Sequence, residues 1–455
     1  MKKEYNVRII SSLFILSLLL TLSSCLRFEN TYSKIPPGPW RAILQLDPST
    51  VTPNPKGEPL EDKLNLSFDE VTNGELPFNF EVEYTDDTTF QVVLLNGDER
   101  IVSRDISFGR SKSRAKDSIV INFPIYDTYI VGLYEEGIIE GEWVVNYREK
   151  YSIPFIARFG MDYRFTQIPK PAALDLTGTW EVTFGPGGDE SAPFAGIGEF
   201  VQEGNDLKGT FRTETGDYRY LHGVVSDDKA YLSVFDGAHA FLFEAKIDAS
   251  AATMVGSFRS GKHYRTVWQA SRNEEATLTS PYQLTNVLDA GQPIDFAFIN
   301  PQGDSIRLSD PTFDGKAKLV QIFGTWCPNC RDETQFLKQY LAANDLPNLE
   351  VLCIGFLRYR KEEKSLAALE RFKTQMDIPY PVLYGGYYDK AEASARLPML
   401  NKIISYPTLL LIDGENRVRK VHTGFNGPAT SKYEEFKQEF DESVQQLLET
   451  LQADS

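Results

Sequence analysis

Cys327 and Cys330 are separated by two residues, in the sequence WCPNC. Two thiols at this spacing can close a small disulfide, or leave one thiolate free to attack a disulfide of another protein. The apolar run 318–323 before them predicts a strand, and residues 331–341, which lack Gly and Pro, predict a helix. Cys327 would then lie at a helix N-terminus, where the helix dipole lowers the pKa of a thiol, and Pro328 fits the first helical turn.

A structural zinc site is the alternative use of such a pair, but zinc takes four ligands. The chain has four cysteines and four histidines, with no second Cys pair and no Cys/His cluster, so redox chemistry without a metal or cofactor is favoured. Cys353 lies in the apolar run 351–354, which predicts a buried strand. We expect it to act as a small hydrophobic side chain, rather than as a third redox thiol.

The 455 residues are too many for one hydrophobic core, so two to four domains are expected. The formal net charge is −17. A surface of this sign repels a phosphate backbone, which argues against nucleic acid as a partner.

The N-terminal 25 residues have the layout of a secretory signal, with Lys2, Lys3 and Arg8 before the apolar stretch 9–22. The stretch ends in Leu-Ser-Ser-Cys, which resembles a bacterial lipobox whose cysteine, Cys25, becomes lipid-modified. An ordinary signal peptide with an incidental cysteine is the alternative. The lipobox interpretation predicts a lipoprotein signal peptide over 1–25 and attachment to a membrane by acyl chains, facing the periplasm of a bacterial cell envelope.

Residues from about 27 to 275 are rich in aromatic and β-branched side chains and in Gly, Asn and Asp turns, which is typical of antiparallel strands. We predict two related β units, 27–168 and 174–275, joined by a stiff Pro-containing linker. The Gly-x-Trp opening of each unit loosely resembles lipocalin-like barrels, so each is expected to be a barrel or a strongly curved sheet. Short motifs recur in the same order in the two units: Gly38-Pro39-Trp40 and Gly178-Thr179-Trp180, Leu76-Pro77-Phe78 and Ala192-Pro193-Phe194, Gly141-Glu142-Trp143 and Gly256-Ser257-Phe258.

Strands and helices alternate in the prediction for residues 288–455, which indicates an α/β domain. A buried strand is predicted over 351–356 and a charged helix over 361–376. The last helix is predicted to begin with a capping box of Ser431 and Glu434.

The sequence FGTWCPNC at 323–330, together with Tyr-Pro-Thr at 406–408, resembles the TlpA/ResA branch of the thioredoxin superfamily. The order of lipobox, β units and redox domain also resembles lipoproteins common in Bacteroidota. The resemblance implies a multidomain protein, in which two antiparallel β units precede an α/β thioredoxin-like domain. It implies a thiol–disulfide oxidoreductase that acts on disulfide-bearing envelope proteins, with a DsbD- or CcdA-like membrane thiol carrier as electron donor.

The resemblance also assigns roles to single residues. Cys327 is implied to be the attacking thiol and Cys330 the resolving thiol of a redox disulfide. Pro407 is implied to be a cis proline facing the disulfide, so that Tyr406 presents its backbone to an extended substrate segment. Trp326 is expected to pack beside the disulfide and shape the docking surface, or to be part of the core.

One position departs from the pattern of thioredoxin, which has a buried Asp six residues before the first cysteine. Gln321 stands there and cannot titrate. Glu333 is a possible substitute, but an exposed helix carboxylate is the expected role. The path of the proton to or from Cys330 is left open.

Two other functions remain as alternatives. A thioredoxin-like thiol peroxidase would place its cysteine in a PxxxTxxC setting, whereas Gly324 occupies the Thr position here. A binding lipoprotein would use its β units for the main role. The direction of exchange, reductase or oxidase, is also open, although the resemblance favours a reductase.

Overall fold

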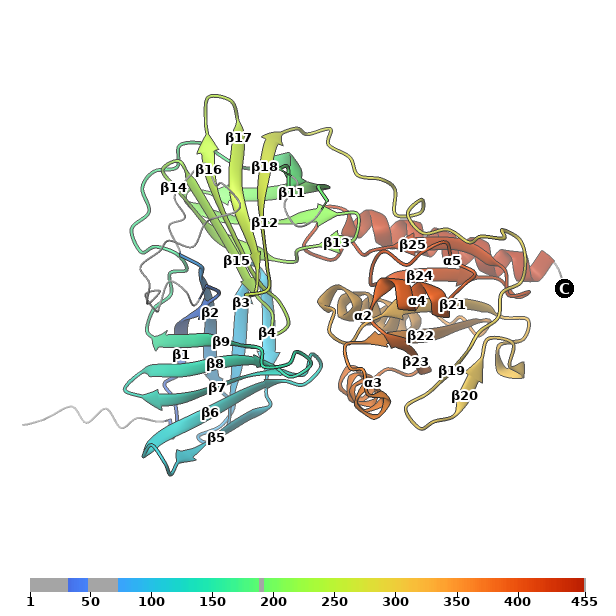
Figure 1. Cartoon of the computed structure of the whole chain (residues 1–455), viewed down its shortest axis with the longest axis horizontal. Helices are drawn as coiled ribbons and strands as arrows, with labels where there is room; N and C mark the ends of the chain where they lie inside the picture. The colour runs from blue at the N-terminus through green and yellow to red at the C-terminus, as the bar shows by residue number, and fades with distance from the viewer. Residues whose placement is uncertain (1–31, 48–72, 188–191, 454–455) are drawn as a thin grey trace, which may run out of the picture.

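The computed structural model describes residues 32–47, 73–187 and 192–453. The predicted signal peptide and the lipidation site Cys25 lie outside this range. Three sheets follow one another along the chain, and the two β units lie beside a C-terminal domain that carries the long helices (Figure 1). No helix in the described part of the chain is both long and apolar enough to span a bilayer.

The first β unit is an antiparallel sheet of nine strands in the order β4-β3-β2-β1-β9-β8-β7-β6-β5. Apolar side chains alternate along its strands, so that one face is buried; in β1, Trp40 stacks on Phe80 with 5.7 Å between ring centroids. The strands are β1 (Gly38–Gln45), β2 (Glu75–Tyr84), β3 (Phe90–Asn96), β4 (Glu99–Ser103), β5 (Ile106–Ser111), β6 (Lys116–Phe123), β7 (Thr128–Glu135), β8 (Ile138–Val145) and β9 (Ser152–Phe159).

The second β unit is a closed antiparallel barrel. Its strands follow the order β11-β10-β18-β17-β16-β15-β14-β12, and a further pairing of β11 with β12 closes the ring, leaving β13 as a short extension. Closure removes the exposed edges that an open sheet would have. The strands are β10 (Gly178–Phe184), β11 (Phe194–Glu203), β12 (Asp206–Thr213), β13 (Gly216–Asp217), β14 (Leu221–Ser226), β15 (Lys229–Phe235), β16 (Ala240–Asp248), β17 (Thr253–Ser260) and β18 (Tyr264–Arg272).

The two units open in the same way, as the repeated Gly-x-Trp motif predicts. In each unit the glycine has a positive φ and the tryptophan is fully buried. The indole N–H of Trp40 donates to the carbonyl of Pro36, and that of Trp180 donates to the carbonyl of Leu176, four residues upstream in both cases. A buried indole N–H usually finds such a partner.

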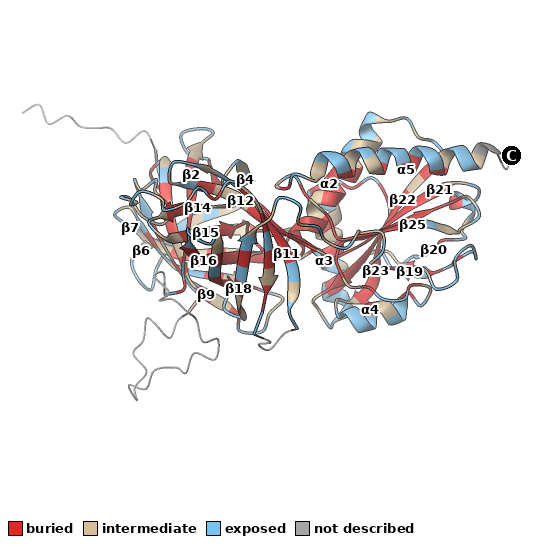
Figure 2. Ribbon diagram, turned by 90° about the horizontal axis from the view of Figure 1, so that it is seen from above, coloured by how far each residue is buried: buried red, intermediate tan, exposed pale blue. Residues whose placement is uncertain are grey.

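The C-terminal domain has a seven-stranded mixed sheet in the order β20-β19-β23-β22-β21-β24-β25, with helices on both faces (Figure 2). α2 and α5 share one face, where Phe336 packs on Phe440, and α3 and α4 cover the other. The elements are β19 (Ala297–Ile299), β20 (Ser305–Arg307), the 3-10 helix η2 (Pro311–Phe313), β21 (Ala317–Phe323), α2 (Pro328–Ala343), β22 (Leu349–Leu357), α3 (Glu362–Met376), β23 (Val382–Tyr387), α4 (Lys390–Arg396), β24 (Thr408–Ile412), β25 (Val418–Thr423) and α5 (Tyr433–Ala453).

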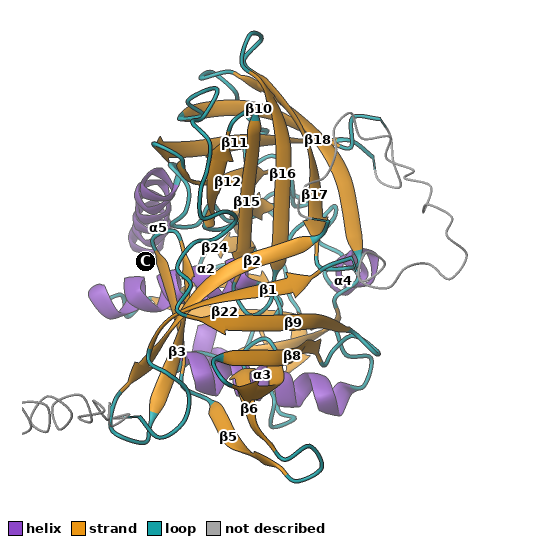
Figure 3. Cartoon of the chain, turned by 90° about the vertical axis from the view of Figure 1, so that its left-hand side faces the viewer, coloured by secondary structure: helices purple, strands orange, loops and turns teal. Residues whose placement is uncertain are grey.

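The expected fold class is confirmed: two antiparallel β units precede a thioredoxin-like α/β domain, and the described helices belong to that last domain (Figure 3). The predicted strand 351–356 and helix 361–376 correspond to β22 and α3. The predicted capping box is wrong. The helix α5 begins at Tyr433, and both the backbone N–H and the hydroxyl of Ser431 donate to Glu199 of the barrel, at 2.9 and 2.7 Å.

Candidate redox site

The two cysteines lie where the central strand β21 ends and α2 begins. Every residue of β21 is buried, because the strand pairs with β22 on one side and β24 on the other. Cys327 is the N-cap of α2, with extended backbone, and Pro328 occupies the first turn as the sequence predicts. The backbone N–H of Cys330 donates to the sulfur of Cys327 at 3.2 Å. A helix N-terminus and an N–H donor both stabilise a thiolate, so this position favours ionisation of Cys327 in the reduced protein.

Cys327 and Cys330 are joined by a disulfide. Only Cys327 reaches the surface, with 6% of its area exposed, whereas Cys330 is fully buried. An approaching sulfur can therefore reach only the first cysteine, which fits the division into attacking and resolving thiols.

The peptide bond between Tyr406 and Pro407 is cis, as expected. It precedes β24 and brings the carbonyl oxygen of Tyr406 to 3.5 Å from the sulfur of Cys327. The phenol of Tyr406 donates to the carbonyl of Tyr388, which fixes the loop beside the disulfide.

Trp326 is half-buried next to the cysteines. Its indole N–H donates to the carbonyl of Phe356 at 3.0 Å, and its ring meets Tyr388 and Tyr406 edge-on at 5.6 Å. The guanidinium of Arg358 stacks on the indole, 4.1 Å from its centroid. Trp326 is thus partly buried beside the redox pair and packs against the C-terminal core.

Beneath the disulfide lies a buried polar group that the sequence interpretation placed wrongly. Glu333 was expected on the helix surface, but its side chain is fully buried. Glu333 lies one turn of α2 beyond Cys330, and that turn faces the sheet. The amide of Gln321 donates to its carboxylate at 2.8 Å and to the carbonyl of Cys330 at 3.2 Å.

Burial raises the pKa of Glu333 to about 8, because the ionised carboxylate loses its hydration, and the hydrogen bond from Gln321 offsets only part of this. Its second oxygen has no hydrogen-bond partner among the described residues. Near neutral pH the carboxyl group therefore holds a proton, close to the main chain of the resolving cysteine.

Cys353 lies in β22 and is fully buried, as expected. Its thiol donates to the side-chain oxygen of Gln321 at 3.2 Å, and burial raises its pKa well above the ordinary value. A thiol held neutral in this way is not a nucleophile.

The second β unit reaches over the redox site, which no sequence pattern predicted. The amide of Asn329, between the two cysteines, donates to the carbonyl of Asp217 at 3.0 Å. The hydroxyl of Ser405, next to the cis-proline loop, donates to the carbonyl of Thr215 at 2.6 Å. The backbone N–H of Gly427 donates to the carboxylate of Asp217 at 2.7 Å.

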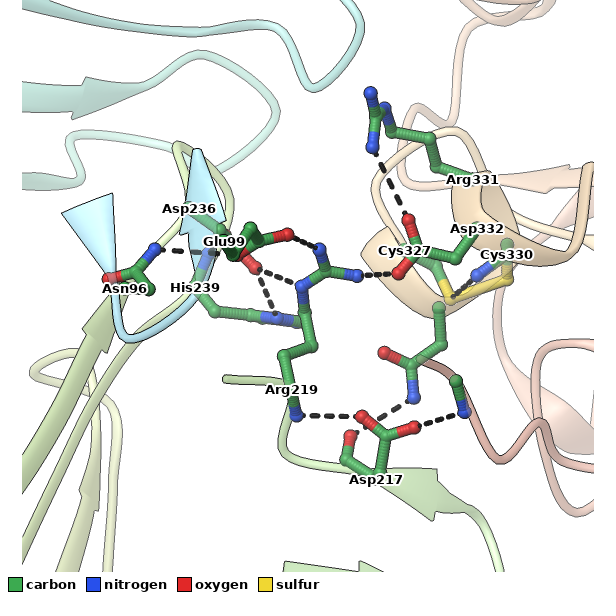
Figure 4. Close-up of polar contacts among 12 residues, drawn as sticks. Asn96, Glu99, Asp217, Arg219, Asp236, His239, Cys327, Cys330, Arg331 and Asp332 are labelled. Carbon is green, nitrogen blue, oxygen red and sulfur yellow. Dashed lines mark hydrogen bonds and ion pairs between the residues drawn. A yellow bond between two sulfur atoms is a disulfide. The ribbon is translucent and has the colours of Figure 1, made fainter. Parts of the chain in front are cut away.

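Arg219 joins all three parts of the chain close to the disulfide (Figure 4). Its guanidinium forms ion pairs with Glu99 of the first β unit, Asp236 of the barrel and Asp332 in the first turns of α2. Only 2% of Arg219 is exposed. The turn 236–239 also holds His239 locally against Asp236, at 3.4 Å.

Known proteins that are similar to this chain match it over the domain that contains the two cysteines. The family model described as Redoxin matches residues 289–436. Over 138 residues the chain is 27% identical to the thioredoxin-like protein YneN of Bacillus subtilis, covering 30% of this chain and 73% of YneN. It is 24% identical to the thiol-disulfide oxidoreductase ResA of Halalkalibacterium halodurans, covering 32% of this chain and 73% of ResA.

Among solved structures, a thiol:disulfide interchange protein of the thioredoxin family from Chlorobium tepidum is similar at 21% identity and a TM-score of 0.26. The match covers 36% of this chain and 99% of that one.

The C-terminal domain is thus of the thioredoxin-like thiol–disulfide oxidoreductase class, since it combines this fold with a Cys-x-x-Cys disulfide at a helix N-terminus. Residues 289–436 form a redoxin domain, and the predicted resemblance to the TlpA/ResA proteins is confirmed.

Proposed function

We propose that this protein reduces disulfides of other proteins in the bacterial cell envelope through Cys327 and Cys330. The observation that carries the proposal is the position of Cys327 as the N-cap of α2, next to the cis Tyr406–Pro407 bond. Of the two cysteines there, only Cys327 has any exposed area, and Cys330 is fully buried.

The exchange has two steps. The thiolate of Cys327 attacks one sulfur of the substrate disulfide, which forms a mixed disulfide and releases the other substrate sulfur as a thiolate. The thiolate of Cys330 then attacks the sulfur of Cys327, which leaves the substrate with two thiols and the protein with the disulfide seen here. Two electrons pass from the dithiol to the substrate, and a thiol-carrying membrane protein of the DsbD or CcdA kind would return them.

Glu333 is proposed to accept the proton of Cys330 during the second step through the ionised fraction of its carboxyl group, which is small near neutral pH and grows as the pH approaches 8. A carboxyl group whose pKa is about 8 exchanges protons readily near neutral pH, unlike one near its usual value. The amide of Gln321 would position it, since this amide contacts both Glu333 and the carbonyl of Cys330.

Trp326 and Tyr406 are proposed to line the surface on which the substrate docks, with Pro407 setting the loop geometry. Cys25 is proposed to carry the lipid that holds the protein at the membrane, facing the periplasm. Metabolic labelling with a radioactive fatty acid should mark the wild type and leave Cys25→Ser unlabelled.

The test of the catalytic proposal is trapping. Cys330→Ser, produced in a bacterial envelope, should accumulate mixed disulfides between Cys327 and substrate proteins, because the resolving thiol is missing. The matched control is Cys327→Ser with Cys330→Ser, which retains Cys353 and should trap nothing. Equal trapping by the control, or no trapped protein while the wild type reduces protein disulfides, would contradict the proposal.

A further inference from the structure

The loops that surround the sulfur of Cys327 are occupied by this chain's own barrel. The redox helix contributes Asn329, the cis-proline loop contributes Ser405, and the loop after β25 contributes Gly427. All three donate hydrogen bonds to one short segment, Thr215–Asp217, which includes β13.

The segment presents main-chain carbonyls to this surface from the tight turn that joins β12 and β13. The carbonyls of Thr215 and Asp217 accept from Ser405 and Asn329, and these carbonyls are two residues apart. Thr215 lies in the tight turn between β12 and β13, and this turn directs both carbonyls at the redox domain. Gly216 between them approaches so closely that a Cβ atom there would lie 2.8 Å from the amide nitrogen of Asn329.

The two β units form a single body through apolar packing. Phe235 and Leu242 of the barrel belong to the hydrophobic core of the first unit, and Phe235 packs on Phe78 with 4.5 Å between ring centroids. Separating these units would expose a shared core, which is costly.

The C-terminal domain has its own hydrophobic core, and among the described residues of the β units only Ile125, which is partly buried, packs against it. Its described contacts with them are mainly hydrogen bonds and ion pairs, such as that of Arg371 with Asp127 at 3.2 Å. An interface of this kind resembles those between domains that move relative to one another, because opening it transfers mostly polar groups to water.

Arg219 neutralises the carboxylates that meet where the β units contact the redox domain. Glu99, Asp236 and Asp332 converge on it from three parts of the chain. Without this cation, three carboxylates would share a site shielded from water, and their mutual repulsion would favour separation of the C-terminal domain from the β units.

We propose that the segment Glu214–Arg219 is an internal occupant of the substrate-docking surface, held in place by Arg219. Exchange with a protein substrate then requires the β units to move away from the redox domain as one body. The partner that fits the vacated surface is a polypeptide segment that offers main-chain carbonyls to Asn329 and Ser405 and a basic side chain to Asp332. This inference rests on the proposed function, because it concerns the same cysteines.

The test measures access to Cys327 without any substrate. The full chain, in a Cys25→Ser background, is reduced and reacted with a small maleimide and with the same maleimide carrying a large polyethylene glycol. Gly216→Ala should raise the rate with the large reagent at least ~10-fold over the wild type, relative to the small reagent, because an open state admits the bulky group. Gly38→Ala is the matched control, since Gly38 also has a φ above 100° but a Cβ there would meet only the ring of Phe159, at 3.8 Å.

Arg219→Met provides a second, independent variant, and Arg100→Met is its control. Arg100 pairs with Glu81 and Glu83 on the exposed surface of the first unit, and these carboxylates are not the ones that pair with Arg219. Arg219→Met should give the same gain in the relative rate, together with an increased radius of gyration in solution scattering, whereas Arg100→Met should match the wild type. Circular dichroism identifies a variant that fails to fold, and the other variant then tests the proposal.

Equal relative rates in the wild type and both variants would overturn the internal occupant while leaving the redox proposal intact. The inference would also be overturned if neither reagent modified the wild type or either variant. The proposed function fails separately, through the trapping experiment.

Discussion

Replacing Glu333 with glutamine should make the stability of the redox domain much less dependent on pH. Glutamine keeps the size of the side chain and its contact with Gln321, but it has no proton to lose. In the wild type the carboxyl group is fully buried, and burial raises its pKa from 4.5 to about 8.

The sign of the effect follows from proton linkage. Between pH 4.5 and pH 8 the unfolded chain has lost the proton of Glu333 while the folded domain still holds it. Because the folded state binds more protons in this window, the free energy of unfolding falls as the pH rises, and it levels off above pH 8. One pKa unit corresponds to about 1.4 kcal/mol, so the fall between pH 5 and pH 8 amounts to about 3 kcal/mol.

Hydrogen exchange followed by mass spectrometry can measure this for one domain, through peptides from β21 and β22 in the oxidised protein. The wild type should lose about 3 kcal/mol of opening free energy between pH 5 and pH 8 through this carboxyl group, and Glu333→Gln should retain most of that amount. Glu449→Gln, at an exposed position of α5, is the control and should follow the wild type. Parallel curves for the wild type and Glu333→Gln would refute the assignment of a buried, protonated Glu333.

Three further predictions concern other parts of the molecule. Cys353→Ala should leave the alkylation rate of Cys327 within ~2-fold of the wild type, since the thiol of Cys353 is buried and held neutral; a larger loss would give Cys353 a redox role. Trp180→Phe should lower the stability of the barrel by about 1 kcal/mol or more in chemical unfolding, because it leaves the carbonyl of Leu176 without its indole donor. An unchanged free energy of unfolding would show that this hydrogen bond does not stabilise the barrel. Phe78→Ala should cost about 3–5 kcal/mol and destabilise both β units together, as Phe78 packs on Phe235; separate transitions for the two units would contradict their description as one body.

The parts of the redox site that lie close together along the chain could be predicted from the sequence. The cysteine spacing and the strand and helix around it are local features, and they correctly placed Cys327 at the start of α2. The cis bond before Pro407 followed from a resemblance that rests on a short motif.

Glu333 could not be placed in this way. Its position three residues after Cys330 puts it near the redox helix, but whether that face is buried depends on β21 and on Gln321, twelve residues earlier. A carboxylate in a charged helix is usually exposed, and the tertiary contacts override that expectation here.

The contact of the barrel with the redox site could not be predicted from the sequence either. Arg219 meets Glu99 and Asp332, which are more than one hundred residues away in opposite directions along the chain. Charged residues at such separations leave no periodic or local signal, so only the arrangement of the three sheets brings them together.

The pKa of the Cys327 thiol in the reduced protein tests the proposed redox chemistry most directly. The rate of alkylation by iodoacetamide, measured from acidic to alkaline pH with the modified residue identified by mass spectrometry, gives this value. Cys327 should react first and titrate clearly below the value of about 8.5 for a free thiol. Titration at or above that value, or preferential modification of Cys330, would contradict the claim that the start of α2 makes Cys327 the nucleophile.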